Sequence, residues 1–139
     1  MDKDEVLKKL NNLKIEIETN NNGSDSLRYA YIHLQEMVKE NSELANEILK
    51  TLKEILSSEK NDKDSLKGAY DALGQIAKVK PELAENVIET FDNVLKSEIN
   101  NLDTLVYAYK TLRDIVKVRP DLSDRTFETF NAGYKRLKK

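Results

Sequence analysis

The sequence predicts an all-α protein of seven helices, and three observations support this fold class. Leu, Lys, Glu, Asn and Ala dominate the 139 residues, whereas 4 Gly and 2 Pro are too few for the turns of a β-sandwich or barrel. Apolar residues recur at the i, i+3, i+4, i+7 spacing of one helical face. The same pattern returns at a fixed interval, so we expect similar helix pairs and no strand.

The repeated unit is 39 residues long and continues without a gap. Its aligned positions include Ser26-Leu27, Ser65-Leu66 and Thr104-Leu105, then Leu34, Leu73 and Leu112, and then Lys39, Lys78 and Lys117. The first 23 residues hold one further helix, because Val6–Leu10 aligns with positions 48–52 of the first unit. The chain therefore divides into a leading half-repeat (1–23) and three repeats (24–62, 63–101 and 102–139) of a single domain.

The first helix of each repeat is expected at 24–41, 63–79 and 102–118. An aspartate precedes each apolar stripe, at Asp25, Asp64 and Asp103. A carboxylate there can accept hydrogen bonds from first-turn amides and meets the positive end of the helix dipole, so these residues predict helix starts. Each stripe also contains a tyrosine, at Tyr31, Tyr70 and Tyr109. We expect these tyrosines to stack in the core, with their hydroxyls reaching polar partners.

The second helices are expected at 42–59, 81–98 and 120–136, after a leading helix at 3–18. Pro81 and Pro120 suit a first helical turn, because the amide proton that proline lacks has no partner inside the helix there. In the third repeat Ser123, Thr126 and Gly133 replace apolar residues of the stripe. This loss predicts an end unit that is partly exposed to water.

Composition and motifs argue against an enzyme. The chain has no Cys and one His, which leaves no disulfide, no thiolate ligand and too few imidazoles for a zinc site. A glycine-rich phosphate loop and a Gly-x-Ser-x-Gly elbow are both missing. We therefore predict no catalytic residue, no metal and no cofactor. The acidic N-terminus and the lack of an apolar run near the ~20 residues of a membrane span predict a cytoplasmic protein that does not enter membranes.

The segment from Asp64 to Ala84, with Ser65-Leu66-Lys67, Ala69-Tyr70 and Pro81-Glu82-Leu83-Ala84, resembles a HEAT repeat of the archaeal and bacterial type. This resemblance covers nearly the whole chain. It implies a right-handed α-α superhelix of about three and a half helix pairs, whose first helices line a concave binding face. Armadillo-like and other α-solenoid classes are the alternatives, whereas tetratricopeptide repeats fit less well because their period is ~34 residues.

Three aromatic side chains lie off the apolar stripes of the first helices. Tyr29 and Tyr107 occupy one register position, on either side of Gly68, and are expected on an exposed face, where aromatic residues are typical interface anchors. His33 is the only histidine and is expected on the surface or in a groove, with Tyr29, Glu36 and Met37 at helical spacing. A histidine without converging partners does not indicate catalysis.

Charged residues segregate by helix. The first helices carry a basic flank that is opposed only by Asp71, formed by Arg28, Lys39, Lys67, Lys78, Lys110, Arg113 and Lys117. The second helices carry an acidic side, formed by Glu82, Glu85, Glu89, Asp92, Asp121, Asp124 and Glu128. Ordinary solubilising charge explains this pattern as well as a function does.

We expect a protein-interaction scaffold whose concave face binds a segment of another protein, with an acidic segment as the candidate. The predicted contact residues are Tyr29, His33, Lys67, Lys78, Tyr107, Lys110, Arg113 and Lys117. Nucleic-acid binding through the basic flank is the alternative, which a net charge of −2 and the absence of Trp make less favourable.

Overall fold

Every regular element of the computed structural model is helical within the residues that it describes, 2–19 and 24–138. The α-helices are α1 (Lys3–Thr19), α2 (Ser24–Glu40), α3 (Ala45–Leu56), α4 (Lys63–Val79), α5 (Ala84–Val94), α6 (Leu102–Val118) and α7 (Ser123–Leu137). Three short 3-10 helices precede α3, α5 and α7, namely η1 (Ser42–Leu44), η2 (Pro81–Leu83) and η3 (Pro120–Leu122). The predicted all-α fold with seven helices is confirmed for these residues.

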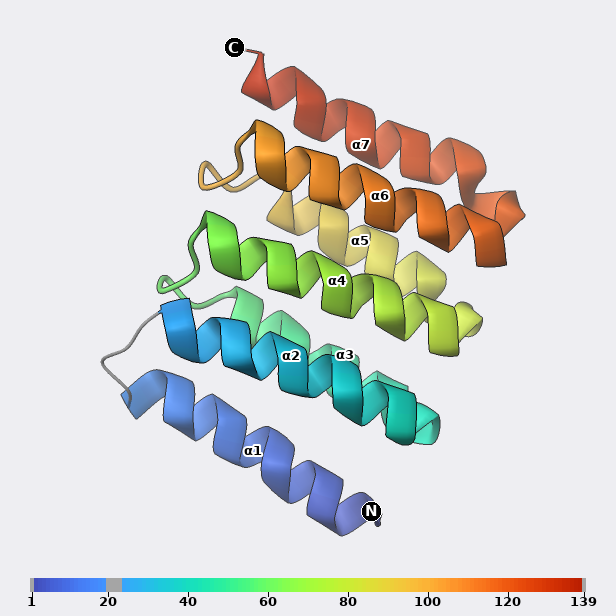
Figure 1. Ribbon diagram of the computed structural model, residues 1–139. Helices are drawn as coiled ribbons and strands as arrows, with labels where there is room; N and C mark the ends of the chain where they lie inside the picture. Colours follow the sequence, from blue (N-terminus) through green and yellow to red (C-terminus); the bar gives the residue numbers. More distant parts are fainter. Residues whose placement is uncertain (1, 20–23, 139) are drawn as a thin grey trace.

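The helices form two layers in a stack. The first helices of the repeats, α2, α4 and α6, lie side by side and make the first-helix layer (Figure 1). The second helices α3 and α5 lie behind them, while α1 packs on α2 and α3, and α7 packs on α5 and α6. These four helices make the second-helix layer. The two termini lie at opposite ends of the stack (Figure 1).

The second helices begin where the proline positions predicted, but as 3-10 turns. Ser42, Pro81 and Pro120 each open three residues of 3-10 helix before the α-helix starts. The helices α3 and α5 end at Leu56 and Val94, earlier than the predicted ends at 59 and 98. The side-chain amide of Asn61 explains the first of these ends, because it donates to the carbonyls of Ile55 (3.1 Å) and Leu56 (3.2 Å) and satisfies the open helix terminus.

The residues that cap α4 and α6 lie two positions before the predicted aspartates. The backbone amide of Ser65 donates to Asp62 Oδ1 (2.8 Å), and the amide of Asp62 donates to Ser65 Oγ (2.9 Å), which completes a capping box. Asn101 and Thr104 repeat this arrangement at the start of α6. Asp64 is therefore a first-turn residue, where its charge still favours the helix dipole.

Two buried tyrosines bind asparagines in the turns that follow their repeats. The Tyr31 hydroxyl donates to Asn61 Oδ1 (2.6 Å), and the Tyr70 hydroxyl donates to Asn100 Oδ1. Both tyrosines are fully buried, as the sequence predicted. Each amide oxygen also accepts a hydroxyl from the following helix, and among the described residues no buried side-chain polar atom lacks a partner. The asparagines thus join three helices without leaving polar groups unsatisfied.

The third tyrosine does not follow this pattern, so the prediction of a three-tyrosine core ladder is wrong. Tyr109 is 48% exposed and its ring meets the edge of Phe130, with ring centroids 5.2 Å apart. In the sequence, Lys139 occupies the register position that Asn61 and Asn100 hold in the earlier repeats. The third repeat therefore offers no amide for this hydroxyl.

The end unit is partly exposed, as predicted, but the exposure falls on the large apolar residues of α7 while three of its small residues face inward. Thr126, Thr129 and Gly133 are buried. A Cβ at Gly133 would lie 3.3 Å from the side chains of both Leu95 and Leu105, so the small residue allows close packing on α5 and α6. The aromatic residues of α7 are displaced towards the surface instead.

Leu73 and Leu137 provide a test of where the core lies. Leu73 is fully buried in α4, whereas Leu137 is 36% exposed near the end of α7. Leu73→Ala is expected to lower the free energy of unfolding by ~2–5 kcal/mol because it leaves a cavity, and Leu137→Ala by less than ~1 kcal/mol. Urea unfolding curves of the two variants measure both costs. Equal costs would contradict the assignment of the core.

The pair Tyr70 and Asn100 is expected to be strongly coupled. Tyr70→Phe removes one hydrogen bond at a cost of ~1 kcal/mol, whereas Asn100→Ala also strands the buried hydroxyl and the carbonyls of Val94 and Ser97, at ~2–4 kcal/mol. With Asn100 already replaced, Tyr70→Phe is expected to be neutral or stabilising, because it removes an unsatisfied group. A double-mutant cycle in urea checks this, and additive costs would contradict the coupling.

Burial of the two tyrosines predicts a loss of stability at alkaline pH. Desolvation raises the pKa of Tyr31 and of Tyr70 above the usual value, although the bonds to asparagine oppose it. As the pH rises, the unfolded chain therefore loses these protons before the folded chain does. The contribution of the two tyrosines to the free energy of unfolding is fully present below pH ~10. Above that pH it falls by up to ~1.4 kcal/mol per pH unit for each tyrosine. Tyr31→Phe and Tyr70→Phe are expected to flatten this fall, measured by urea unfolding between pH 8 and 11. An unchanged slope would contradict the assignment.

Candidate interaction surface

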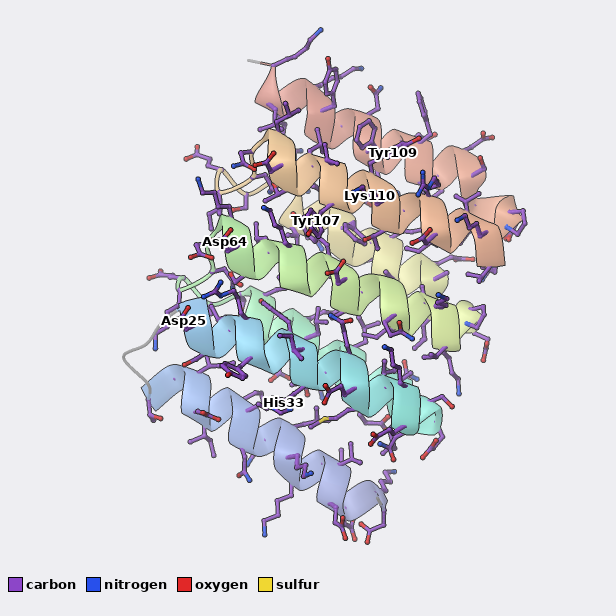
Figure 2. All side chains as sticks on the ribbon, in the orientation of Figure 1. Asp25, His33, Asp64, Tyr107, Tyr109 and Lys110 are labelled. Carbon is purple, nitrogen blue, oxygen red and sulfur yellow. The ribbon has the colours of Figure 1, made fainter. Side chains whose placement is uncertain are left out.

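The predicted contact residues lie on the exposed side of the first-helix layer, but they do not form a single cluster. Figure 2 shows Tyr107 and Lys110 on α6, next to α4, and His33 between α2 and α1. Lys67 and Lys78 are separated by eleven residues of α4, or about 16 Å along the helix. The surface therefore has three parts, a centre around Tyr107, a part near α1 and a row of cations at the helix ends.

The centre is a tyrosine flanked by two lysines from neighbouring helices. Lys67 Nζ of α4 lies 5.4 Å from the centroid of the Tyr107 ring, and Lys110 Nζ of α6 lies 5.8 Å from it. Both distances are within the range of cation–π attraction. Tyr107 is half-buried and packs against the core, rather than standing free as predicted. Lys67, which covers the Tyr107 ring, belongs to α4. The partial burial of Tyr107 therefore could not be predicted from the sequence of α6 alone.

Asp71 completes the central cluster. Partial burial raises the pKa of its carboxyl above the usual value, while the charge of Lys110 opposes this rise. The charge of Lys110 on α6 thus acts on an exposed carboxylate of α4, an attraction of the kind that contributes little to stability. The cluster thus places two basic side chains and one acidic side chain around an aromatic ring.

Tyr29 and His33 form the second part of the surface, on α2. Tyr29 is 69% exposed, and its ring stacks on the imidazole of His33 with centroids 6.4 Å apart. His33 also lines a groove of about 400 Å³ between α1 and α2. The other lining residues are Lys9, Asn12, Leu13, Glu16, Glu36, Met37 and Glu40. The structure thus brings His33 together with the three neighbours that helical spacing predicted, Tyr29 through ring stacking and Glu36 and Met37 in a groove with more acidic than basic groups.

The remaining predicted cations lie at the exposed C-terminal halves of α4 and α6. Lys78 and Arg113 are exposed, and Lys117 Nζ lies 3.4 Å from the carboxylate of Asp114 one turn away. Lys78 and Lys117 hold the same register position, in the last turn of their helices. They favour the negative ends of the helix dipoles as well as any bound anion.

The basic flank has more acidic neighbours than the sequence suggested. Arg28 is paired with Asp25, whose hydrogen bond and charge raise the pKa of the guanidinium, and the carboxylate of Asp64 adds to this effect. Figure 2 shows Asp25 and Asp64 at the starts of α2 and α4, on the exposed side. Asp71 is the one acidic residue within the basic stripe itself, but these carboxylates lie beside the stripe, so the surface carries both signs of charge.

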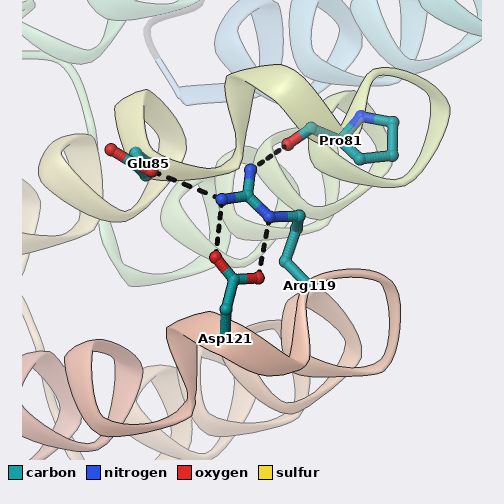
Figure 3. A network of polar contacts seen from close by, with 4 residues as sticks. All are labelled: Pro81, Glu85, Arg119 and Asp121. Atoms are coloured by element: carbon teal, nitrogen blue, oxygen red, sulfur yellow. Dashed lines mark hydrogen bonds and ion pairs between the residues drawn. The ribbon is translucent and has the colours of Figure 1, made fainter.

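Carboxylates of the second-helix layer are engaged in structural pairs. The guanidinium of Arg119 donates to Asp121 at 2.8 and 2.9 Å, to the carbonyl of Pro81 at 3.0 Å and to Glu85 at 3.3 Å (Figure 3). The hydrogen bonds from Arg119 lower the pKa of Asp121. This network ties η3 to η2 and to α5. Glu85 is thus part of the contact between successive repeats rather than a free charge.

A second pair links α7 to α5. The guanidinium of Arg125 and the hydroxyl of Thr129 both donate to the carboxylate of Asp92. Burial acts to raise the pKa of Asp92, but these two hydrogen bonds outweigh it and lower the pKa. The sequence predicted this side as acidic with few cations, and it could not show that both arginines reach across to the previous repeat.

Searches for two other kinds of site give negative results. Across residues 2–19 and 24–138, no three His, Cys, Asp or Glu side chains come together in a way that could hold a metal ion. Over the same part of the chain, no helix is long and apolar enough to cross a membrane.

Comparison of the chain with protein-family models, with curated proteins and with solved structures finds no match.

Proposed function

We propose that this chain is a HEAT-like α-solenoid that acts as a cytoplasmic protein-interaction scaffold without catalytic activity. In this proposal the helix pairs form a right-handed superhelix, and the exposed side of the first-helix layer is its concave binding face. The 39-residue register supports it, because α2, α4 and α6 begin at equivalent positions and lie side by side.

The central cluster of Lys67, Tyr107 and Lys110 is the observation on which the proposal rests. The Tyr107 ring is held by the core and by two lysine side chains, so little conformational entropy is lost when a partner covers it. Rigid aromatic side chains next to cations are typical anchors for a segment that carries carboxylates. A partner carboxylate could approach the two ammonium groups while an apolar neighbour covers the ring.

The register of the three first helices suggests how a partner segment lies. Tyr29, Gly68 and Tyr107 occupy equivalent positions on α2, α4 and α6, and Gly68 puts no side chain at the middle position, where a Cβ would lie 3.4 Å from Tyr31. With helix axes ~8–10 Å apart, the two tyrosines are about 16–20 Å apart. An extended segment of about five or six residues spans this distance across the helices.

Selection from a random peptide library tests the proposal directly. The intact chain is expected to enrich acidic peptides, and a Lys67→Glu/Lys110→Glu variant is expected not to retain them. For an enriched peptide, Tyr29→Ala and Tyr107→Ala are expected to speed dissociation about tenfold or more. Lys78→Glu with Lys117→Glu is expected to slow association and to reduce its dependence on salt. Surface-immobilised binding kinetics measure both rates.

The matched control is Lys50→Glu with Lys53→Glu, because these exposed lysines lie on α3 in the second-helix layer. They should leave both rates within about twofold of the original values. Thermal unfolding of each variant identifies any loss of fold, which matters for the half-buried Tyr107. Peptides that bind the lysine variant as well as the intact chain would refute the proposal. Tight binding of a single-stranded oligonucleotide that weakens steeply with salt would favour the nucleic-acid alternative.

A further inference from the structure

The outer face of α7 has the composition of a core but is exposed. Phe127 is 66% exposed, Tyr134 38% and Leu137 36%, and Tyr109 of α6 lies beside them at 48%. In the previous repeat Ile88, Leu95 and Tyr70 hold the register positions of Phe127, Tyr134 and Tyr109, and none of the three is more than 4% exposed, whereas the counterpart of Leu137 is the exposed Glu98. Exposed contiguous apolar surface of this kind marks interaction sites.

The rings on this face are ordered by contacts with one another. Phe130 is partly buried and connects the two helices, since its ring lies 5.2 Å from that of Tyr109 and 6.3 Å from that of Tyr134. We call the surface formed by Tyr109, Phe127, Phe130, Tyr134 and Leu137 the α7 face. A terminal repeat of a stacked array normally ends in a polar surface. The α7 face does not, and no element of the described residues covers it.

One edge of the α7 face is acidic in the N-terminal half of the helix and basic in the C-terminal half. Asp124 and Glu128 lie in the N-terminal half of α7, and Lys135 and Lys138 lie in the C-terminal half, all four exposed. Their spacing of three and four residues, with Asn131 between them, places them on one side of the helix. Lys138 Nζ already lies 5.3 Å from the centroid of the Tyr134 ring, at the border of the aromatic face.

We propose that the α7 face binds the same face of a second copy of this chain, with the two α7 helices antiparallel about a two-fold axis at Asn131. In such a pair each edge meets the same edge of the partner, running in the opposite direction. Asp124 then lies opposite the partner subunit's Lys138, and Glu128 lies opposite the partner subunit's Lys135. Both ion pairs occur twice by symmetry.

The same axis aligns the aromatic residues. Phe127 lies opposite the partner subunit's Tyr134, and Phe130 lies close to the axis, so rings cover rings throughout the contact. The charge pairs and the ring pairs therefore specify one register between them. In a parallel two-fold arrangement this charged edge would instead meet the other edge of the partner's α7 face, so neither the Asp124–Lys138 nor the Glu128–Lys135 pairs would form.

The other end of the stack is a weaker candidate for covering the α7 face. On α1 the large exposed apolar side chains among the described residues are Leu7 at 37% and Ile15 at 49%, eight residues apart. That spacing is about 12 Å along the helix, so the two side chains do not form a continuous patch. Head-to-tail contact would leave most of the α7 rings against polar residues.

Sedimentation equilibrium of the full chain between about 1 µM and 1 mM tests the proposal. A reversible monomer–dimer equilibrium is expected, and Phe127→Asp is expected to weaken it about tenfold or more, because it places a charge against a ring. Tyr29→Asp is the matched control, since Tyr29 is equally exposed but lies on α2, and it should leave the dimerisation constant within about twofold. Circular dichroism establishes that each variant keeps its helices.

Charge reversal tests the register. Glu128→Lys and Lys135→Glu should each weaken dimerisation about threefold to tenfold, and the double variant should recover to within about twofold, because each changed residue meets the other's replacement in the partner. Seven residues separate the two positions, so they do not contact each other within one helix. A monomer at all concentrations, a dimer that Phe127→Asp leaves intact, continuing polymerisation, or a double variant weaker than both single ones would each overturn the proposal.

Discussion

The stack depends on the buried asparagines that follow the second helices. Asn61 Nδ2 satisfies open carbonyls at the end of α3, while its Oδ1 accepts hydroxyls from Tyr31 and Ser65. One amide therefore ends a helix, positions the next helix and anchors the tyrosine of the previous first helix. A buried polar group with all its partners in place specifies a single geometry, because any other arrangement strands several groups at once. Asn100 repeats the junction one unit later.

Much of the fold could be predicted from the sequence, because the 3.6-residue period and the 39-residue register are local and visible. Helix ends and surface exposure could not, because they depend on contacts between helices. Tyr107 was predicted to be exposed and Tyr109 to be buried, and the structure reverses both. Tyr107 is covered by Lys67 of the preceding first helix, whereas Tyr109 lies on the α7 side of α6, where its ring meets Phe130 and no further first helix among the described residues covers it.

The sequence predicted which residues lie on the candidate surface, but not how these residues cluster in space. Sequence register placed the lysines on one side of the first helices, and the structure separates them into a central cluster and a row at the helix ends. The structure also shows carboxylates paired with these cations one helical turn away, such as Asp25 with Arg28 and Asp114 with Lys117. The electrostatic field is therefore local, so the proposed recognition relies more on the Tyr107 cluster than on a long basic track.

The two proposals use different parts of the molecule, and together they constrain its assembly. A two-fold contact through α7 is closed, because each α7 face is consumed by the other, so the stack does not polymerise. The dimer carries two copies of the Tyr107 cluster, both on first-helix layers that the α7 contact leaves largely open. A partner with two acidic segments would then bind the second site at a raised effective concentration. Weak binding at each site is thus sufficient for a stable complex.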